Sequence, residues 1–195
     1  DFDISKNNGS YDIWVVKLSK FGDLEWEKSY GGAEIDKGVS IVKNTENSYT
    51  ILGNTNSQVI KGAPSKGMND YIMIKLDSEG NTISKIRHGG SDFDFAKDMI
   101  QTNDGSYFIT GYSKNPNNLF DTSQDKNTVF LTQTQKNGIH EKSWIINGSE
   151  DDLGISLCQL TNGSIIIVGT TESNDGDFQR IYSKSTDIFI AILKE

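Results

Sequence analysis

Apolar and polar residues alternate along this chain in short runs, and each run returns after 58 residues. The clearest alternating run is 39–43 (VSIVK), which returns at 97–101 and again at 155–159. Alternation with a period of two predicts half-buried β-strands, and we find no sustained apolar stripe with the 3.6-residue period of a helix. Self-similarity at a fixed spacing indicates that each unit is one supersecondary element packed against its neighbours.

A second kind of run is almost continuously apolar and ends in glycine. It occupies 48–53 (SYTILG), 106–111 (SYFITG) and 164–169 (SIIIVG). Runs rich in β-branched and aromatic residues are typical of strands covered on both faces. A turn precedes each run, and one left-handed position explains why Asn47 stands where the other copies have Gly105 and Gly163.

Two further strands complete the repeating unit after a polar loop. The third strand occupies 12–18 (DIWVVKL), 70–76 (DYIMIKL), 128–134 (TVFLTQT) and 187–193 (DIFIAIL). A glycine turn at Gly22, Gly80 or Gly138 then leads to a more polar fourth strand. Each unit therefore reads as four strands joined by turns.

Four short antiparallel strands in a repeat of this length are the signature of a β-propeller blade. We predict an all-β fold: a β-propeller fragment of about three four-stranded antiparallel blades, forming a single repeat array over residues 1–195. The predicted units are a partial blade at 12–31, blades at 36–89 and 94–147, and a partial blade at 153–193. Since a closed ring usually needs at least four blades, we expect other chains or further sequence to complete it.

The composition narrows the possible partners. Lys and Arg number 19 against 27 Asp and Glu, for a formal net charge of −8. This balance disfavours nucleic acid and anionic membranes, and no apolar run approaches the roughly 18 residues of a membrane span. The one cysteine, Cys158, aligns with Val42 and Ile100, so we expect a small buried hydrophobe.

The chain resembles a known group of repeats. The residues that carry the resemblance are 12–18, 22–32 (GDLEWEKSYGG) and 173–177 (SNDGD). They are similar to extracellular β-propeller-type repeats of secreted proteins from Bacteroidota and low-GC Gram-positive bacteria, whose units read WVVKLD…GG…DGGYIVAG. The resemblance covers essentially the whole chain and is weakest at 128–147. It implies a propeller fold and a secreted or cell-surface location, and it brings no catalytic residues.

Acidic residues recur where each first strand begins. They form three pairs, Glu34 with Asp36, Asp92 with Asp94, and Glu150 with Asp152. One interpretation is that each aspartate accepts backbone N–H groups and locks a turn. The alternative is a structural Ca²⁺, which takes six to eight oxygen ligands. Asp175 and Asp177 form a second Ca²⁺ candidate, a looser site than an EF-hand loop because the other ligands of that loop are missing, and the alternative there is a solvated turn. We expect no other cofactor.

Aromatic side chains are the remaining candidates for ligand binding, because rings stack on sugars and anchor protein interfaces. Trp26 aligns with Ser84 and Lys142, and Trp144 with Lys28 and Ile86. Neither ring belongs to a repeated core position, so each either faces outward or is a partly buried edge residue. Trp14, by contrast, aligns with Ile72 and Phe130, and we expect it in the core.

The two histidines of the chain are isolated from each other and from other metal ligands in the sequence. His88 and His140 have no second imidazole or thiolate at ligand spacing, so a zinc site is not expected. His88 aligns with Tyr30 and Ile146, which predicts a semi-buried strand residue.

Three functions fit these observations. The first is a non-catalytic extracellular binding or adhesion module with a protein or glycan ligand. The second is a structural or assembly component of a larger bacterial surface complex. The third is a glycan-active enzyme (a glycoside hydrolase or lyase), for which the non-repeated acids Glu172 and Asp121 are the candidates.

Overall fold

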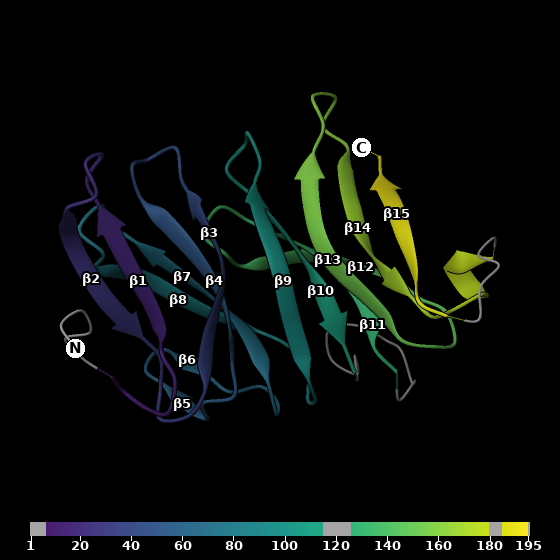
Figure 1. Ribbon diagram of the computed structural model, residues 1–195, viewed down its shortest axis with the longest axis horizontal. Coiled ribbons are helices and arrows are strands. Elements are labelled where there is room, and N and C mark those ends of the chain that lie inside the picture. The colour runs from purple at the N-terminus through teal and green to yellow at the C-terminus, as the bar shows by residue number, and fades with distance from the viewer. Residues whose placement is uncertain (1–6, 115–125, 180–184, 195) are drawn as a thin grey trace.

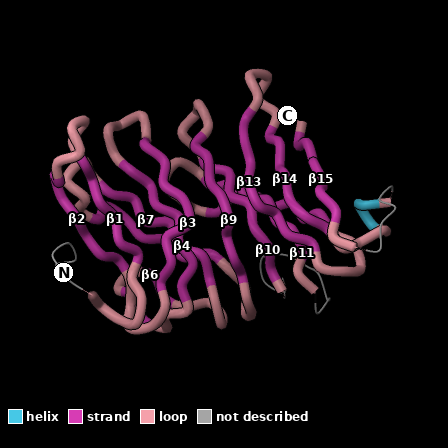
Figure 2. Tube along the Cα trace, viewed as in Figure 1, coloured by secondary structure: helices cyan, strands magenta, loops and turns pink. Residues whose placement is uncertain are grey.

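The computed structural model describes residues 7–114, 126–179 and 185–194, and in this part the regular structure consists of β-strands and one 3₁₀ turn, η1 (Gly176–Phe178). All but two of the strands form four antiparallel sheets in chain order, which we call sheets I to IV. They follow one another along the long axis of the molecule (Figures 1 and 2). The predicted all-β fold with repeated antiparallel sheets is confirmed.

The two middle sheets are complete four-stranded units. Sheet II contains β3 (Asp36–Lys43), β4 (Tyr49–Thr55), β7 (Asp70–Leu76) and β8 (Thr82–His88). Sheet III contains β9 (Asp94–Gln101), β10 (Tyr107–Ser113), β11 (Thr128–Thr134) and β12 (His140–Ile146). In both sheets the strand order follows the chain. A two-stranded hairpin, β5 (Val59–Ile60) with β6 (Ala63–Pro64), interrupts the long loop of sheet II.

The outer sheets contain parts of the same unit. Sheet I pairs β1 (Ile13–Leu18) with β2 (Leu24–Tyr30), which correspond to the third and fourth strands. Sheet IV contains β13 (Asp152–Gln159), β14 (Ile165–Thr171) and β15 (Asp187–Leu193) in this order, and they correspond to the first three strands of the unit.

The backbone irregularities also repeat. The pairing register shifts in the first strands of sheets II, III and IV, so that Val39, Lys97 and Ile155 are left out of the ladder. Such bulges bend a strand and increase its twist. The expected left-handed turn position is confirmed: Asn47 has φ 53°, Gly105 87° and Gly163 90°.

The glycine inside each second strand, at position 53, 111 or 169, is required by close packing. A Cβ on Gly111 would lie 2.9 Å from the Phe130 ring on the next strand and would overlap the carbonyl of Phe95. Gly169 makes the same approach to Phe189. At these two positions the glycine lets an aromatic ring of the third strand lie across the second strand, whereas Gly53 makes room for Ile13 of the preceding sheet.

Three apolar clusters join consecutive sheets. Ile13 and Tyr30 of sheet I pack with Ile72 of sheet II. Tyr71 and Met73 of sheet II pack with the next sheet, and Val129 and Leu131 of sheet III pack with sheet IV. Each fully buried side chain of this size contributes about 1.5–3 kcal/mol, so the contacts between sheets are a main source of stability.

Two core predictions were wrong, for the same reason. Trp14 is 44% exposed, although its counterparts Ile72 and Phe130 are almost completely buried. Cys158 is also exposed, although its counterparts pack against the following sheet. Both residues lie on the outer face of a terminal sheet, where no further sheet covers them in the described part of the chain.

Candidate functional site

The most regular polar feature lies where consecutive sheets meet, at the start of β3, β9 and β13. The first residue of each strand is a buried aspartate: Asp36, Asp94 or Asp152. Its Oδ2 accepts the backbone N–H four residues earlier, at 2.8 Å from Gly32, 2.6 Å from Gly90 and 2.9 Å from Gly148. This is the hydrogen bond of a turn-locking aspartate.

A second aspartate, from the start of the third strand, approaches each of the first two. The position of a Cβ on Gly31 would contact both Asp12 Oδ1 and Asp36 Oδ2, and a Cβ on Gly89 would contact both Asp70 Oδ1 and Asp94 Oδ2. The glycine therefore provides the space in which two carboxylates face each other. We call these arrangements the first and second carboxylate pairs.

Each partner aspartate also holds the loop before it. Asp12 Oδ2 accepts from the backbone N of Asn8 at 2.5 Å, and Asp70 Oδ2 from that of Lys66 at 2.9 Å. This role of Asp12 and Asp70 was not predicted from the sequence. The signal was present, because an aspartate opens three of the four third strands, whereas Thr128 opens the other.

Burial makes the second pair electrostatically unfavourable. Burial raises the pKa of Asp94 to about 6, and the charge of Asp70 adds to the rise. Burial also raises the pKa of Asp70, against the opposing effects of the Lys66 N–H and the Arg87 guanidinium. The Arg87 guanidinium is buried beside this pair: its Nη1 lies 3.4 Å from Asp70 Oδ2, and its Nη2 donates to the Ser57 carbonyl at 2.7 Å.

The acids that were expected to pair with Asp36, Asp94 and Asp152 are not members of the carboxylate pairs. Glu34 is exposed, Asp92 is half-buried, and Glu150 forms an exposed ion pair with Lys126 at 2.9 Å. In the described residues, no group of three or more His, Cys, Asp and Glu side chains gathers as a metal site. The structure therefore pairs the buried aspartates differently from the sequence hypothesis.

Asp175 and Asp177 bind a neighbouring turn. Asp175 Oδ1 accepts from the backbone N of Ser149 at 2.8 Å, and Asp177 Oδ2 from that of Asn147 at 3.0 Å. Both carboxylates therefore stabilise the loop that precedes β13.

The two candidate tryptophans lie between sheets. Trp26 Nε1 donates to the Ser78 carbonyl at 3.0 Å, and its ring covers Gly80 of the next sheet. Trp144 stacks on Phe108 with ring centroids 6.1 Å apart and joins the cluster between sheets III and IV. Both rings are half-buried, so their described contacts are those of edge residues that pack between sheets.

One acid on the innermost strands connects three sheets. Asp98 of β9 accepts from Ser40 of β3 at 3.3 Å through Oδ1 and from Ser156 of β13 at 2.6 Å through Oδ2. The three residues occupy the same repeat position, and β9 packs directly against β3 and β13. Both oxygens of Asp98 are thus used to hold neighbouring strands together.

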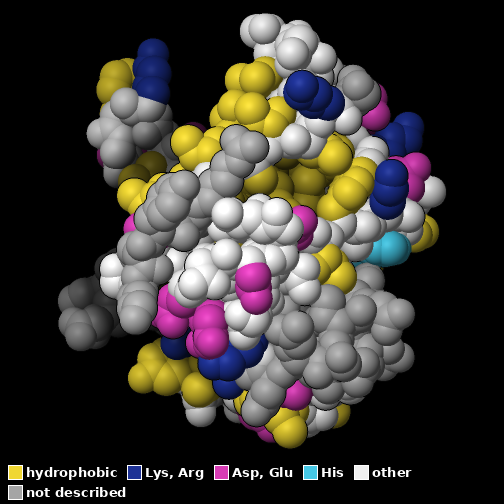
Figure 3. All heavy atoms as spheres, turned by 90° about the vertical axis from the view of Figure 1, so that its right-hand side faces the viewer, with side chains coloured by type: hydrophobic (Ala, Val, Ile, Leu, Met, Phe, Trp, Pro, Cys, Tyr) yellow, Lys and Arg dark blue, Asp and Glu magenta, His cyan; other side chains and the backbone are white. Residues whose placement is uncertain are grey.

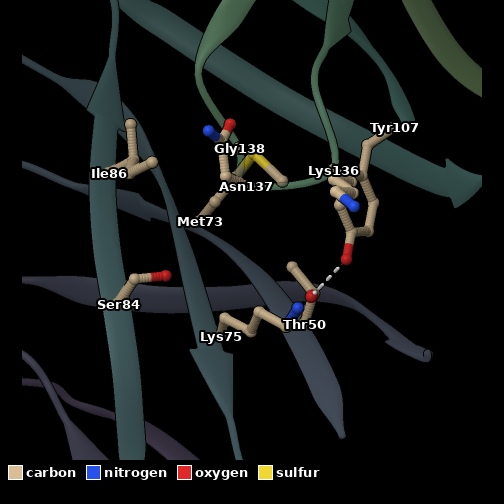
Figure 4. Close-up of a pocket in the computed structure, with 9 residues that line it drawn as sticks. All are labelled: Thr50, Met73, Lys75, Ser84, Ile86, Tyr107, Lys136, Asn137 and Gly138. Atoms are coloured by element: carbon tan, nitrogen blue, oxygen red, sulfur yellow. Dashed lines mark hydrogen bonds between the residues drawn. The ribbon is translucent and has the colours of Figure 1, made fainter. Parts of the chain in front are cut away.

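The cavity between sheets II and III is too small for a ligand. Its volume is about 10 Å³, the space needed by a single water molecule. Thr50 and Tyr107 form a 2.8 Å hydrogen bond on one side, and Met73 and Gly138 lie on another (Figure 4). This cavity is a packing defect within the inter-sheet contact.

The remaining candidates are separate from one another. His88 is buried, more deeply than expected, and stacks on Tyr71 with ring centroids 5.3 Å apart. Glu172 is exposed and accepts from Thr186 Oγ1 at 3.3 Å. Asp121 lies outside the described residues. The described part of the chain contains no helix long and apolar enough to cross a membrane.

Comparisons with known proteins add little about function. No family model and no curated protein matches the chain. A protein of unknown function from Bacteroides caccae is similar in structure, with TM-score 0.48 and 13% identity, over 78% of this chain and 45% of its own. An apocarotenoid oxygenase from Synechocystis is similar with TM-score 0.45 and 14% identity, over 98% of this chain and 46% of its own. The chain spans less than half the length of either protein, and neither likeness supports an activity.

Proposed function

We propose that this chain is a section of a β-propeller-type array and acts as a non-catalytic binding and assembly module. Sheets I to IV are its blades, and the two terminal sheets dock onto further blades of the same kind. The resemblance to secreted bacterial repeats supports a place outside the cell or on its surface, where the completed array binds a protein or glycan.

One observation carries the proposal: the terminal sheets expose side chains at positions that are interior elsewhere. Ile188 and Ile190 of β15 are 76% and 69% exposed, whereas their counterparts Tyr71 and Met73 are 0% and 4% exposed. Val168 and Cys158 lie on the same face. We call this the C-terminal end face. Figure 3 looks onto this end of the molecule and shows hydrophobic side chains gathered there.

The opposite end of the array also exposes side chains whose counterparts in the other units are buried. Ile41 of β3 is 53% exposed, although its counterparts Met99 and Leu157 are 2% and 6% exposed against the preceding sheet. Trp14 is exposed beside it, and the two residues line a hollow of about 360 Å³. We call this the N-terminal end face. Within the array, each sheet packs on the next in the same way. The face that corresponds to the C-terminal end face of one sheet contacts the face that corresponds to the N-terminal end face of the following sheet.

The acids of the described residues favour a structural role over catalysis. Asp98 holds three strands, Asp175 and Asp177 hold a turn, and the buried aspartates hold the loops between units. A glycosidase instead needs two carboxyl groups that flank a substrate-sized space.

Self-association tests the proposal, because a second copy offers an end face of the required type. We expect the chain to associate as its concentration rises in light scattering coupled to size exclusion. Ile190→Glu should weaken this association at least tenfold, while the matched control Val59→Glu, on the 80%-exposed β5 hairpin, should leave it unchanged. A chain that stays monomeric at every concentration, or an equal effect of both variants, would contradict the proposal.

A further inference from the structure

A polar groove lies between the turns that join the first and second strands of sheets III and IV. Its volume is about 330 Å³, within the range of about 300–1,000 Å³ that is usual for small-molecule sites. One wall is the turn after β9, with Asn103 and Asp104, and the other is the turn after β13, with Thr161 and Asn162. Figure 1 shows both turns at the same edge of the molecule. We call this the amide groove.

The corresponding region between sheets II and III is closed by one tyrosine. The Tyr107 hydroxyl lies 2.8 Å from Thr50 Oγ1, donates to Asn44 Oδ1 at 2.9 Å and accepts from Gln101 Nε2 at 3.3 Å. In sheet IV the position of Tyr107 is taken by Ile165, which has no hydroxyl and cannot form this bridge. The groove residues that correspond to the three partners of Tyr107 are Phe108, Thr102 and Gln159.

An ion pair that helps to close the region in sheet II is also missing from sheet III. Lys75 Nζ lies 3.4 Å from Glu46 Oε2, and the counterparts of these residues in the amide groove are Gln133 and Asp104. Asp104 accepts from Thr102 Oγ1 at 2.6 Å instead, and this bond, with others from its own turn, holds the pKa of the Asp104 carboxyl below its ordinary value. The groove therefore contains one fixed, ionised acceptor and no cation that pairs with it.

The other groups in the amide groove are neutral hydrogen-bonding side chains. Within the described residues, the side chains of Asn103, Gln133 and Thr161 make no hydrogen bond, and Gln159 uses only Nε2, which donates to the Gly163 carbonyl at 3.2 Å. None of the residues that line the groove is basic, so it does not suit a phosphate or another anion. Amide and hydroxyl groups both donate and accept, which matches an uncharged ligand rich in hydroxyl groups.

We propose that the amide groove binds a neutral saccharide through hydrogen bonds to amides of sheets III and IV. The inference rests on the proposed function as a binding module and names its ligand class and site. Phe108 lines the groove but is only 8% exposed, so hydrogen bonds rather than ring stacking hold the sugar. A peptide strand fits less well, because the walls are turns and offer no open strand edge for pairing.

An amide NMR titration with neutral gluco-, manno-, galacto- and xylo-oligosaccharides tests the proposal. We expect saturable shifts at 102–106 and 159–163 with at least one of these sugars. Asn103→Ala removes a free amide, and Gln133→Lys places a cation beside Asp104 as in sheet II, so each should weaken binding about tenfold or more. Gln58→Ala, at an exposed amide near the β5 hairpin, is the matched control and should leave the affinity unchanged.

The outcomes separate this inference from the assembly proposal. Ile190→Glu, which changes the C-terminal end face, should still bind the sugar, because the amide groove lies between sheets III and IV. A chain that associates but shows no shift at either turn with any sugar of the panel would overturn the inference alone. Equal effects of Gln133→Lys and Gln58→Ala would also overturn it, because binding would then lie outside the groove.

Discussion

Tyr107 of sheet III and Thr50 of sheet II share a buried hydrogen bond of 2.8 Å between their hydroxyl groups. The Tyr107 hydroxyl also lies 2.9 Å from Asn44 Oδ1, so one polar group of sheet III is satisfied by two residues of the sheet before it. A buried polar contact of this kind fixes how two sheets align, which apolar packing alone does not specify.

Removing this hydroxyl should destabilise the chain while leaving the ring in place. We expect Tyr107→Phe to lower the free energy of unfolding by about 1–3 kcal/mol, because Thr50 and Asn44 lose a buried partner. Urea unfolding measures the change. Tyr112→Phe, where the ring packs beside Phe95, is the matched control and should change stability by less than about 0.5 kcal/mol. Equal losses would show that the hydroxyl network is not the cause.

The close approach at Gly111 predicts a sharp response to a single methyl group. Gly111→Ala places a Cβ against the Phe95 carbonyl and the Phe130 ring, so we expect a loss of more than about 2 kcal/mol. Gly38→Ala is the control, since its Cβ would meet only the Ile13 side chain at 3.3 Å. Thermal unfolding of both variants decides the matter, and a Gly111→Ala chain as stable as the control would refute the packing account.

His88 makes stability depend on pH. Burial lowers its pKa from 6.5 to about 4, and the charge of Lys66 and the nearby His140 add to the decrease, while a hydrogen bond with the Gly138 backbone opposes it. The folded chain therefore binds fewer protons at this site than the unfolded chain between pH 6.5 and 4. The stability present above pH 6.5 is lost as the pH falls through this range, by up to ~3 kcal/mol.

The His88→Gln variant isolates this contribution. Because other groups also titrate in this range, the informative quantity is the difference between the two chains in urea unfolding at pH 7.5 and 4.5. The unmodified chain should lose more stability on acidification than His88→Gln. Burial also lowers the pKa of His140, which in turn lowers that of His88, so His140→Gln should give a pH dependence between those of the other two chains. Parallel pH profiles for the unmodified chain and His88→Gln would exclude a buried neutral imidazole.

Trp26 distinguishes a packing role from a ligand-binding role. Trp26→Phe removes the N–H bond to the Ser78 carbonyl and part of the ring that covers Gly80, so we expect a loss of about 1–2 kcal/mol. Trp14→Phe, at a more exposed tryptophan, should cost much less when measured by chemical unfolding. If Trp26→Phe were neutral for stability, the ring would be available for a ligand instead.

Much of the fold was predictable because each structural feature of the unit appears several times in the sequence. The 58-residue period located the strands, and the exchange of Asn47 for Gly105 and Gly163 identified a left-handed turn that the backbone confirms. The same reasoning failed for Trp14 and Cys158. Alignment identifies a position as interior, but it does not say whether the sheet that covers it is present.

The carboxylate pairs were harder to predict from the sequence than the strands. Asp36 and Asp94 stood out because an acid lies two residues before each, and nearness in sequence suggested the wrong partner. Their observed partners, Asp12 and Asp70, start a strand of the preceding unit, and only the fold brings these starts together at Gly31 and Gly89. Asp98 was missed because a single acid among repeat-related serines gives no pattern.

Sedimentation of mixed variants tests the central claim, that the two end faces are complementary surfaces of one repeating array. Ile41→Glu disables the N-terminal end face and Ile190→Glu the C-terminal end face, so each variant alone should be monomeric. An equimolar mixture should form a dimer through the one intact face of each chain, as a head-to-tail interface requires. A mixture that stays monomeric while the unmodified chain associates would contradict head-to-tail docking of these faces.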